Sequence, residues 1–136
     1  MAQITSTLLL SQQAFDGSTA TSTGDAVKAN GYYGQADGKH TVQFSLSGFV
    51  GKIRIEGTLA TTPASTDWAV VNLGTGVTAF TFDTTGAVSE TAITFLEYDT
   101  ATSTNVSYNF MGNFTFVRAY VYDWTAGTVN SIRVNY

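Results

Sequence analysis

Apolar and polar residues alternate with a period of two along most of the chain, and no stretch keeps a helical period. Clusters of Gly, Asn and Asp separate the alternating runs, and these residues favour turns. The pattern predicts strands at residues 3–10, 26–33, 41–47, 52–59, 68–73, 78–82, 92–98, 106–111, 114–122 and 129–136. Short strands at this spacing predict an all-β protein, an antiparallel β-sandwich of jelly-roll type.

The sharpest local prediction is a hairpin within residues 106–122, because Gly112-Asn113 matches a two-residue turn with Gly at its first central position. Pairing Met111 with Phe114 then fixes the register of the two flanking strands. The register directs one apolar set toward the core: Val106, Tyr108, Phe110, Val117, Ala119 and Val121. The opposite side carries Ser107, Asn109, Met111, Phe114, Phe116, Arg118, Tyr120 and Tyr122.

This second side of the predicted hairpin is too apolar to be left wholly to water. It could be core under a neighbouring sheet, a subunit interface, where Tyr, Phe, Met and Arg are enriched, or a sugar-stacking platform of aromatic rings. The core interpretation is favoured and the sugar platform is the weakest. The candidate interface residues are Phe114, Phe116, Arg118, Tyr120 and Tyr122.

Length and composition limit the class of protein. The 136 residues suit a single domain spanning 1–136. A net charge of −4, with only six Lys or Arg, offers no basic stripe, so neither nucleic acid nor a membrane is an expected partner. The absence of Cys excludes disulfides, a Cys-based zinc site and a thiol nucleophile.

Catalytic motifs find little support. The only histidine, His40, follows the turn-like "ADGK", and no Gly-x-Ser-x-Gly elbow accompanies it, so we expect a surface histidine whose removal leaves function unchanged. The segment "GQADGKH" is too short by one residue for a phosphate loop and predicts a hairpin turn. The carboxylates do not form a calcium loop, and a glycosidase pair would need a tertiary approach. We expect no enzyme, no cofactor and no metal.

Two polar segments are candidates for contacts with other molecules. In "KIRIEGTLATTPASTDWAVV", Ile53 and Ile55 point to the core, while Lys52, Arg54 and Glu56 are expected as solvated charges. Residues 61–66 are expected to form a polar loop around Pro63, after which Asp67 turns the chain back and Trp68 and Val70 resume a core-like pattern. We interpret this loop as structural or interfacial. Residues 15–26 are predicted to be a loop, or else an arm that reaches a neighbour.

Two segments together resemble small β-sandwich virion proteins of tailed bacteriophages. In that family a strand pair "I-x-I-x-G-T-L … D-W" precedes a closing "V-R-A-x-V … A-G-T-V-x-x-I-x-V-x-Y". The matching residues here are Ile53, Ile55, Gly57, Thr58, Leu59, Asp67, Trp68, Val117, Arg118, Ala119, Val121, Ala126, Gly127, Thr128, Val129, Ile132, Val134 and Tyr136. The likeness covers the chain from Gly51 to Tyr136, and its motifs describe a fold more than a chemistry.

The resemblance implies a non-enzymatic structural subunit, present in many copies on a virion. A capsid decoration or cement protein is the favoured role, and a neck, tail or fibre component is the alternative. Its implied partners are copies of itself, with a trimer favoured, and other virion proteins, reached through strand edges, residues 15–26 and the mixed aromatic side. The N-terminal "MAQITSTLLL" does not resemble a signal peptide, so we expect assembly in the host cytoplasm. A carbohydrate-binding sandwich module, or a tail or fibre adhesin that binds glycans, is the second interpretation.

Overall fold

The computed structural model describes residues 6–34, 37–82 and 88–136, and all regular elements among them are β-strands. In chain order these are β1 (Thr7–Leu10), β2 (Gln13–Ala14), β3 (Ser22–Thr23), β4 (Val27–Lys28), β5 (Lys39–Thr58), β6 (Ala69–Val70), β7 (Thr75–Phe82), β8 (Val88–Ala92), β9 (Leu96–Met111) and β10 (Phe116–Asn135). The all-β prediction is confirmed. The predicted strand at 3–10 falls partly on residues outside the described part of the chain.

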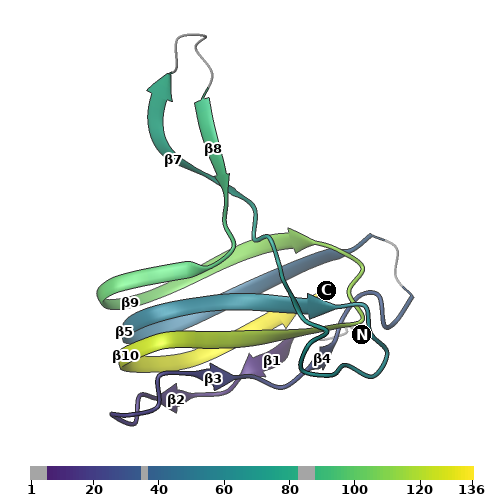
Figure 1. Cartoon of the computed structure of the whole chain (residues 1–136), viewed down its shortest axis with the longest axis horizontal. Helices are drawn as coiled ribbons and strands as arrows, with labels where there is room; N and C mark the ends of the chain where they lie inside the picture. Colours follow the sequence, from purple (N-terminus) through teal and green to yellow (C-terminus); the bar gives the residue numbers. More distant parts are fainter. Residues whose placement is uncertain (1–5, 35–36, 83–87) are drawn as a thin grey trace, which may run out of the picture.

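Eight of these strands form one antiparallel sheet (Figure 1). Its centre is the long pair β5 and β10, whose register runs from Phe116 opposite Thr58 to Asn135 opposite Thr41. β9 and β6 pair with the edge of β5 that faces away from β10. β1 to β4 lie along the edge of β10 that faces away from β5. Each of the four short strands is antiparallel to β10, so the N-terminal segment follows that strand backwards.

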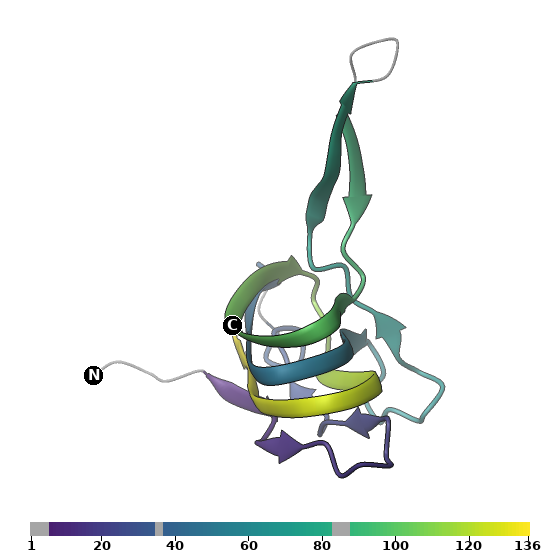
Figure 2. The same cartoon turned by 90° about the vertical axis from the view of Figure 1, so that its left-hand side faces the viewer.

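The three long strands bend back on themselves, so that the two halves of each lie over one another (Figure 2). We call residues 96–98, 50–58 and 116–122 the front layer, and residues 39–47, 104–111 and 128–135 the rear layer. β5 joins the strands predicted at 41–47 and 52–59 but ends at Thr58, and β10 joins those predicted at 114–122 and 129–136 but runs only from Phe116 to Asn135. The intervening glycines, interpreted from sequence as turns, are bulges within continuous strands.

Two glycines allow the bend because their backbones nearly touch. Gly48 in β5 has φ 59° and Gly127 in β10 has φ 85°, a left-handed conformation that favours glycine. A Cβ on Gly127 would come within 2.2 Å of the carbonyl oxygen of Gly48. Trp124 fills the inside of the same bend, where its indole N–H donates to the Ala126 carbonyl at 2.9 Å.

The hydrophobic core lies between the two layers. Alternate residues of β5 and β10 point into it, which is why each strand has a period of two in its burial. The residues of β5 and β10 with no exposed surface are Val42, Phe44, Phe49, Ile53, Ile55, Val117, Ala119, Val121, Val129 and Ile132. The predicted burial of Val117, Ala119, Val121 and Phe110 is therefore confirmed, and Val106 and Tyr108 are partly buried against the same core.

The hairpin predicted within 106–122 is wrong, because β9 and β10 do not pair with each other. β5 lies between them: Tyr108 is opposite Val42, and Ala119 is opposite Ile55. Residues 112–115 connect the rear layer to the front layer, and the Thr115 N–H donates to the Thr58 carbonyl at 2.8 Å. Thus the two segments belong to opposite edges of β5.

The segment 15–26, expected as a loop or free arm, is docked along β10. The Phe15 N–H donates to the Gly127 carbonyl at 2.9 Å, and the Trp124 N–H donates to the Ala20 carbonyl at 3.0 Å. Farther along, the Gly24 N–H donates to the Ala119 carbonyl at 2.8 Å. These bonds cover the outer edge of the strand.

β7 and β8 form a separate two-stranded sheet. Figures 1 and 2 show this hairpin standing away from the folded sheet. At its base the Leu73 N–H donates to the Ile93 carbonyl, and the Ile93 N–H donates to the Gly74 carbonyl, both at 2.8 Å. The strand predicted at 78–82 lies within β7, and the one predicted at 92–98 spans the end of β8 and the start of β9.

Candidate functional site

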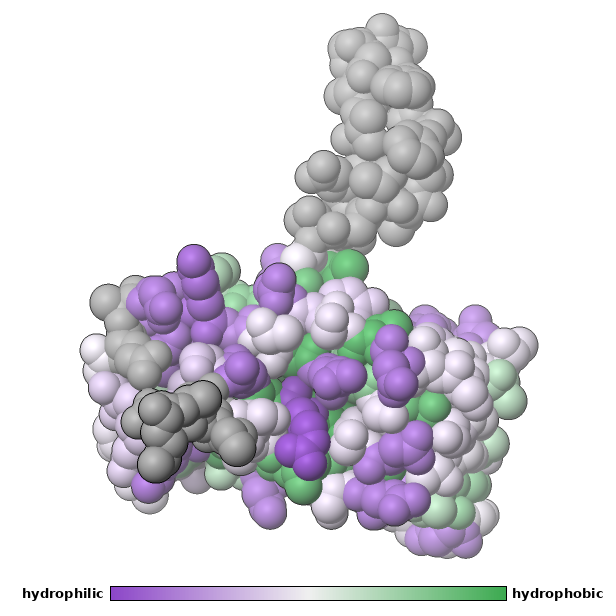
Figure 3. Space-filling view, turned by 180° about the vertical axis from the view of Figure 1, so that it is seen from behind, coloured by the Kyte–Doolittle hydropathy of each residue, from purple (hydrophilic) through white to green (hydrophobic). Residues whose placement is uncertain are grey.

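The two outer faces of the folded sheet differ in chemistry. The rear face carries hydroxyl and amide side chains, with Thr41 donating to Asn109 at 2.8 Å and Asn130 donating to Ser47 at 2.9 Å. Figure 3 shows hydrophilic residues over much of that face. The front face is aromatic and charged, and we treat it as the candidate site.

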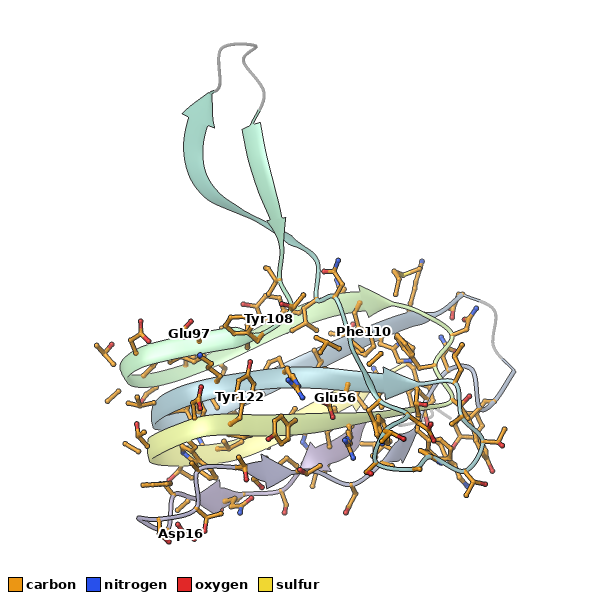
Figure 4. All side chains as sticks on the ribbon, in the orientation of Figure 1. Asp16, Glu56, Glu97, Tyr108, Phe110 and Tyr122 are labelled. Carbon is orange, nitrogen blue, oxygen red and sulfur yellow. The ribbon has the colours of Figure 1, made fainter. Side chains whose placement is uncertain are left out.

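Three cross-strand pairs of β5 and β10 build the front face. Lys52 is opposite Tyr122, Arg54 is opposite Tyr120, and Glu56 is opposite Arg118. Their side chains point outward because the intervening residues, Ile53, Ile55, Val117, Ala119 and Val121, occupy the core. Figure 4 shows Glu56 and Tyr122 on this face of the front layer.

Glu56 is the centre of an ion network. Its side chain is only 6% exposed, and it accepts bonds from two arginines. Arg118 Nε donates to Oε1 at 2.8 Å, while Arg54 donates to Oε2 from Nε at 2.9 Å and from its terminal nitrogen at 2.8 Å. A nearly buried carboxylate needs such partners, because charge without compensation is costly to remove from water. Both carboxylate oxygens are thereby satisfied.

Aromatic rings also contact the guanidinium groups of Arg54 and Arg118. The guanidinium of Arg54 lies 4.7 Å from the ring centroid of Tyr120 and 5.3 Å from that of Tyr122, and these two rings stack at 5.4 Å. The guanidinium of Arg118 lies 4.2 Å from the ring of Trp68. Such contacts contribute about 0.5–1 kcal/mol each at exposed sites. These contacts fix the orientation of the Arg54, Arg118 and Trp68 side chains.

Further contacts extend the front face at both ends of the three cross-strand pairs. Lys52 Nζ forms a 3.2 Å ion pair with Asp123 and lies 5.7 Å from the ring of Phe95, which is 40% exposed. The hydrogen bond from Lys52 to Asp123 raises the pKa of that lysine. At the other end the ring of Phe116 lies 5.6 Å from that of Tyr32. The front face is therefore a continuous row of aromatic and cationic groups.

A second aromatic contact lies near the C-terminal residue. The rings of Tyr33 and Tyr136 stack at 5.6 Å. Partial burial, together with a hydrogen bond between its hydroxyl and Tyr33, raises the pKa of Tyr136 to about 12. The phenol of Tyr136 therefore remains neutral at physiological pH.

The structure brings together four of the five predicted interface residues. Phe116, Arg118, Tyr120 and Tyr122 alternate along β10 on the front face. Phe114 is not on the front face. It packs against the core, and its ring lies so near Gly57 that a Cβ on that glycine would be 2.6 Å from it. Ser107, Asn109 and Met111 belong to the rear layer. The mixed aromatic side predicted for one hairpin is thus divided between both layers.

Several residues of the front face were misjudged from sequence. Glu56, expected as a solvated charge, is 4% exposed. Trp68 and Val70, expected in the core, are partly or largely exposed, and Val71 and Leu73 are buried instead. Asp67 does turn the chain back as predicted, since it accepts from the Ala64 N–H at 2.7 Å. In the sequence, the alternating segments "K-I-R-I-E" and "R-A-Y-V-Y" were the available signal for the front face. Only the pairing of β5 with β10 shows that these two segments lie side by side.

His40 is buried, not on the surface. It is 2% exposed, and its ring stacks on Phe110 at 4.6 Å. Its Nε2 accepts from the Asn30 N–H at 3.3 Å, and Nδ1 lies 3.0 Å from the Gly38 carbonyl, an arrangement that fits a neutral imidazole protonated at Nδ1. Burial lowers the pKa of His40. It is a structural residue at one end of the core.

Within residues 6–34, 37–82 and 88–136, no cluster of three His, Cys, Asp or Glu side chains could hold a metal ion. In the same part of the chain, no helix is suited to crossing a membrane. Comparisons with protein-family models, curated proteins and solved structures give no significant match.

Proposed function

We propose that the chain is a non-enzymatic structural subunit, present in many copies on a tailed-phage particle, and that its front face binds other virion proteins. A capsid decoration or cement protein is the favoured role, with a neck, tail or fibre component as the alternative. The likeness of residues 51–136 to virion proteins supports this setting. We assign assembly to the host cytoplasm and favour a trimer.

The observation that carries the proposal is the composition and order of the front face. Tyr, Trp and Arg are the residues that most often dominate binding energy at protein interfaces. Here Arg54, Arg118 and Trp68 are held by ion pairs and ring contacts, so less side-chain entropy is lost when a partner binds. Lys52, Arg54 and Arg118 are also three of the six cations of a chain with net charge −4. Glu56 and Asp123 pair with these cations, so the front face suits a protein surface of mixed aromatic and polar character, including another part of this chain.

Glycan binding is a weaker explanation of the same face. A sugar platform needs an open ring face, but Tyr120 and Tyr122 stack on each other and lie under Arg54. We further propose that the folded sheet is a β-sandwich of jelly-roll type, because its two layers enclose one core.

The test is to locate the protein. Quantitative mass spectrometry of purified particles should find it in many copies relative to the portal, and light scattering should show self-association of the isolated chain. Absence from purified particles would overturn the virion proposal. A strictly monomeric chain that binds glycans on an array would favour the carbohydrate-binding interpretation.

A further inference from the structure

We infer that the outer edge of β9 is a docking site for another strand, and that its occupant is β7 of a neighbouring copy. The inference rests on the proposed multicopy function and names one contact between copies. It concerns an edge of the sheet, whereas the front face is left for other partners.

The outer edge of β9 has no partner strand within the described part of the chain, where only β5 pairs with it. Asn72 and Gly74 lie beside its last residues, Asn109 to Met111, across a small pocket, and the rest of the edge is left for another strand. β9 has 16 residues, and from Thr100 to Met111 it contains neither a charged residue nor proline. Proteins normally protect an edge with charges, proline, bulges or short strands, because unpaired N–H and C=O groups invite another chain. The opposite edge of this sheet is protected, since β1 to β4 cover β10. We therefore expect the edge of β9 to pair with a further strand.

The residues of β9 that point inward support the same conclusion. Tyr98, Val106 and Tyr108 pack against the core but are only partly buried. Figure 4 shows Tyr108 at this upper edge of the folded sheet. A further strand beside β9 would complete their burial, at about 25 cal/mol for each Å² of apolar surface removed from water.

The β7–β8 hairpin is the matching occupant. A two-stranded hairpin is at best marginally stable alone in water, so a projecting one needs a third strand. β7 has 8 residues, as does the straight rear arm of β9 from Thr104 to Met111. Neither segment contains a charged residue, so no like charges would meet.

The direction of the hairpin makes the contact intermolecular. Figures 1 and 2 show the hairpin pointing away from the β9 of its own chain. A contact between one copy's hairpin and the next copy's edge joins two different surfaces, and such contacts close into rings or continue as filaments. A ring of three would give the trimer favoured above.

Two variants remove one side of the contact each. In the first, a Gly-Asn-Gly linker replaces residues 75–92; the body should fold, because Leu73 and Ile93 are already hydrogen-bonded at the hairpin base. In the second, proline is placed on β9 as Thr104→Pro or Asn105→Pro. Neighbouring residues direct their N–H groups to opposite sides of a strand, so one proline removes a bond to β5 and the other only an edge donor. The edge variant is the one of the two with the higher melting temperature, because it keeps every bond to β5.

Multi-angle light scattering then decides the question. We expect a wild-type oligomer, two monomeric variants, and a heterodimer when the variants are mixed, because one supplies the hairpin and the other the edge. A mixture that stays monomeric, or a hairpin-less variant that still oligomerises, would overturn the inference; a hairpin-less dimer would place β9 against β9. A monomeric wild type overturns it too, while detection of the protein in purified particles would leave the proposed function intact.

Discussion

Arg118 lies directly opposite Glu56, and its Nε donates to Oε1 of that carboxylate at 2.8 Å. The two residues are 62 positions apart in the chain, so their contact depends on the pairing of β5 with β10. The side chain of Glu56 is 6% exposed, whereas those of Arg54 and Arg118 are 32% and 21% exposed. The acid is therefore the member of the network that links the other two.

Replacing Glu56 by alanine should destabilise the fold by about 1–3 kcal/mol. Loss of a buried partner costs about 3–5 kcal/mol where the remaining charge is fully buried, and the partial exposure of both arginines reduces this figure. Urea unfolding measures the change. The exposed Glu97 provides the control, since Glu97→Ala should stay within about 0.5 kcal/mol of wild type. Equal effects at both positions would contradict the role assigned to the network.

The glycine contact at the bend gives a second prediction. Gly127→Ala should cost more than about 3 kcal/mol, because it adds a clash with the Gly48 carbonyl to the strain of a positive φ. Gly17 also has a positive φ, of 94°, but nothing lies within 4 Å of a Cβ there, so Gly17→Ala should cost only about 1–2 kcal/mol. Thermal unfolding compares them. Equal losses would mean that the clash is relieved by movement of the backbone.

The alternation of residues was sufficient to predict strands and burial. Val117, Ala119 and Val121 are buried as predicted, because an alternating strand has only one apolar side. The partner strand was not predictable from the turn at Gly112-Asn113. Phe114 occupies the space above Gly57 in a different strand, and this long-range packing overrides the local turn preference.

Strand ends were misread for a related reason. Gly48 and Gly51 fit turns when only their neighbours are considered, but here they are bulges that let β5 bend while it keeps both partner strands. The front face depends on the same non-local pairing. Tyr120 and Tyr122 were recognisable as candidates from the sequence, but the position of Arg54 over their rings was not, because it depends on the pairing of β5 with β10.

His40 should make stability depend on pH near neutrality. Its folded pKa is lowered by burial from the ordinary value of 6.5, so its neutral form is favoured in the folded chain. The stability it supports is complete above pH 6.5 and falls as pH decreases toward the folded pKa, because the unfolded chain takes up a proton first. Urea unfolding at about pH 7.5 and pH 5.5 should differ for wild type but not for His40→Leu, since this is the only histidine. A wild-type chain equally stable at both values would refute the buried neutral imidazole.

Asp16 should titrate at unusually low pH. Its Oδ1 accepts from the backbone N–H groups of Thr19 at 2.7 Å and Ser18 at 2.8 Å, and these bonds lower its pKa from 3.8 to about 2. Its contribution to stability is therefore present above pH 3.8 and is lost as pH falls to about 2. NMR titration of the carboxyl carbon measures this pKa directly. A midpoint near 3.8 would show that the turn at 16–19 is not formed in solution.

Removing the two stacked tyrosines should separate folding from binding. Tyr120 and Tyr122 point away from the core, so Tyr120→Ser with Tyr122→Ser should leave a folded chain that loses the stack of the two rings and their contacts with Arg54 and Lys52. If they are central interface residues, each contributing about 2 kcal/mol, affinity for the particle should fall by about 30-fold for each tyrosine and by up to about 1,000-fold for both. Gln43→Ser with Arg133→Ser is the control, because these residues form an exposed cross-strand pair on the rear face. Circular dichroism checks folding and co-sedimentation with particles measures binding. Undiminished binding of the tyrosine variant, or equal losses in both variants, would remove the front face from the proposed interface.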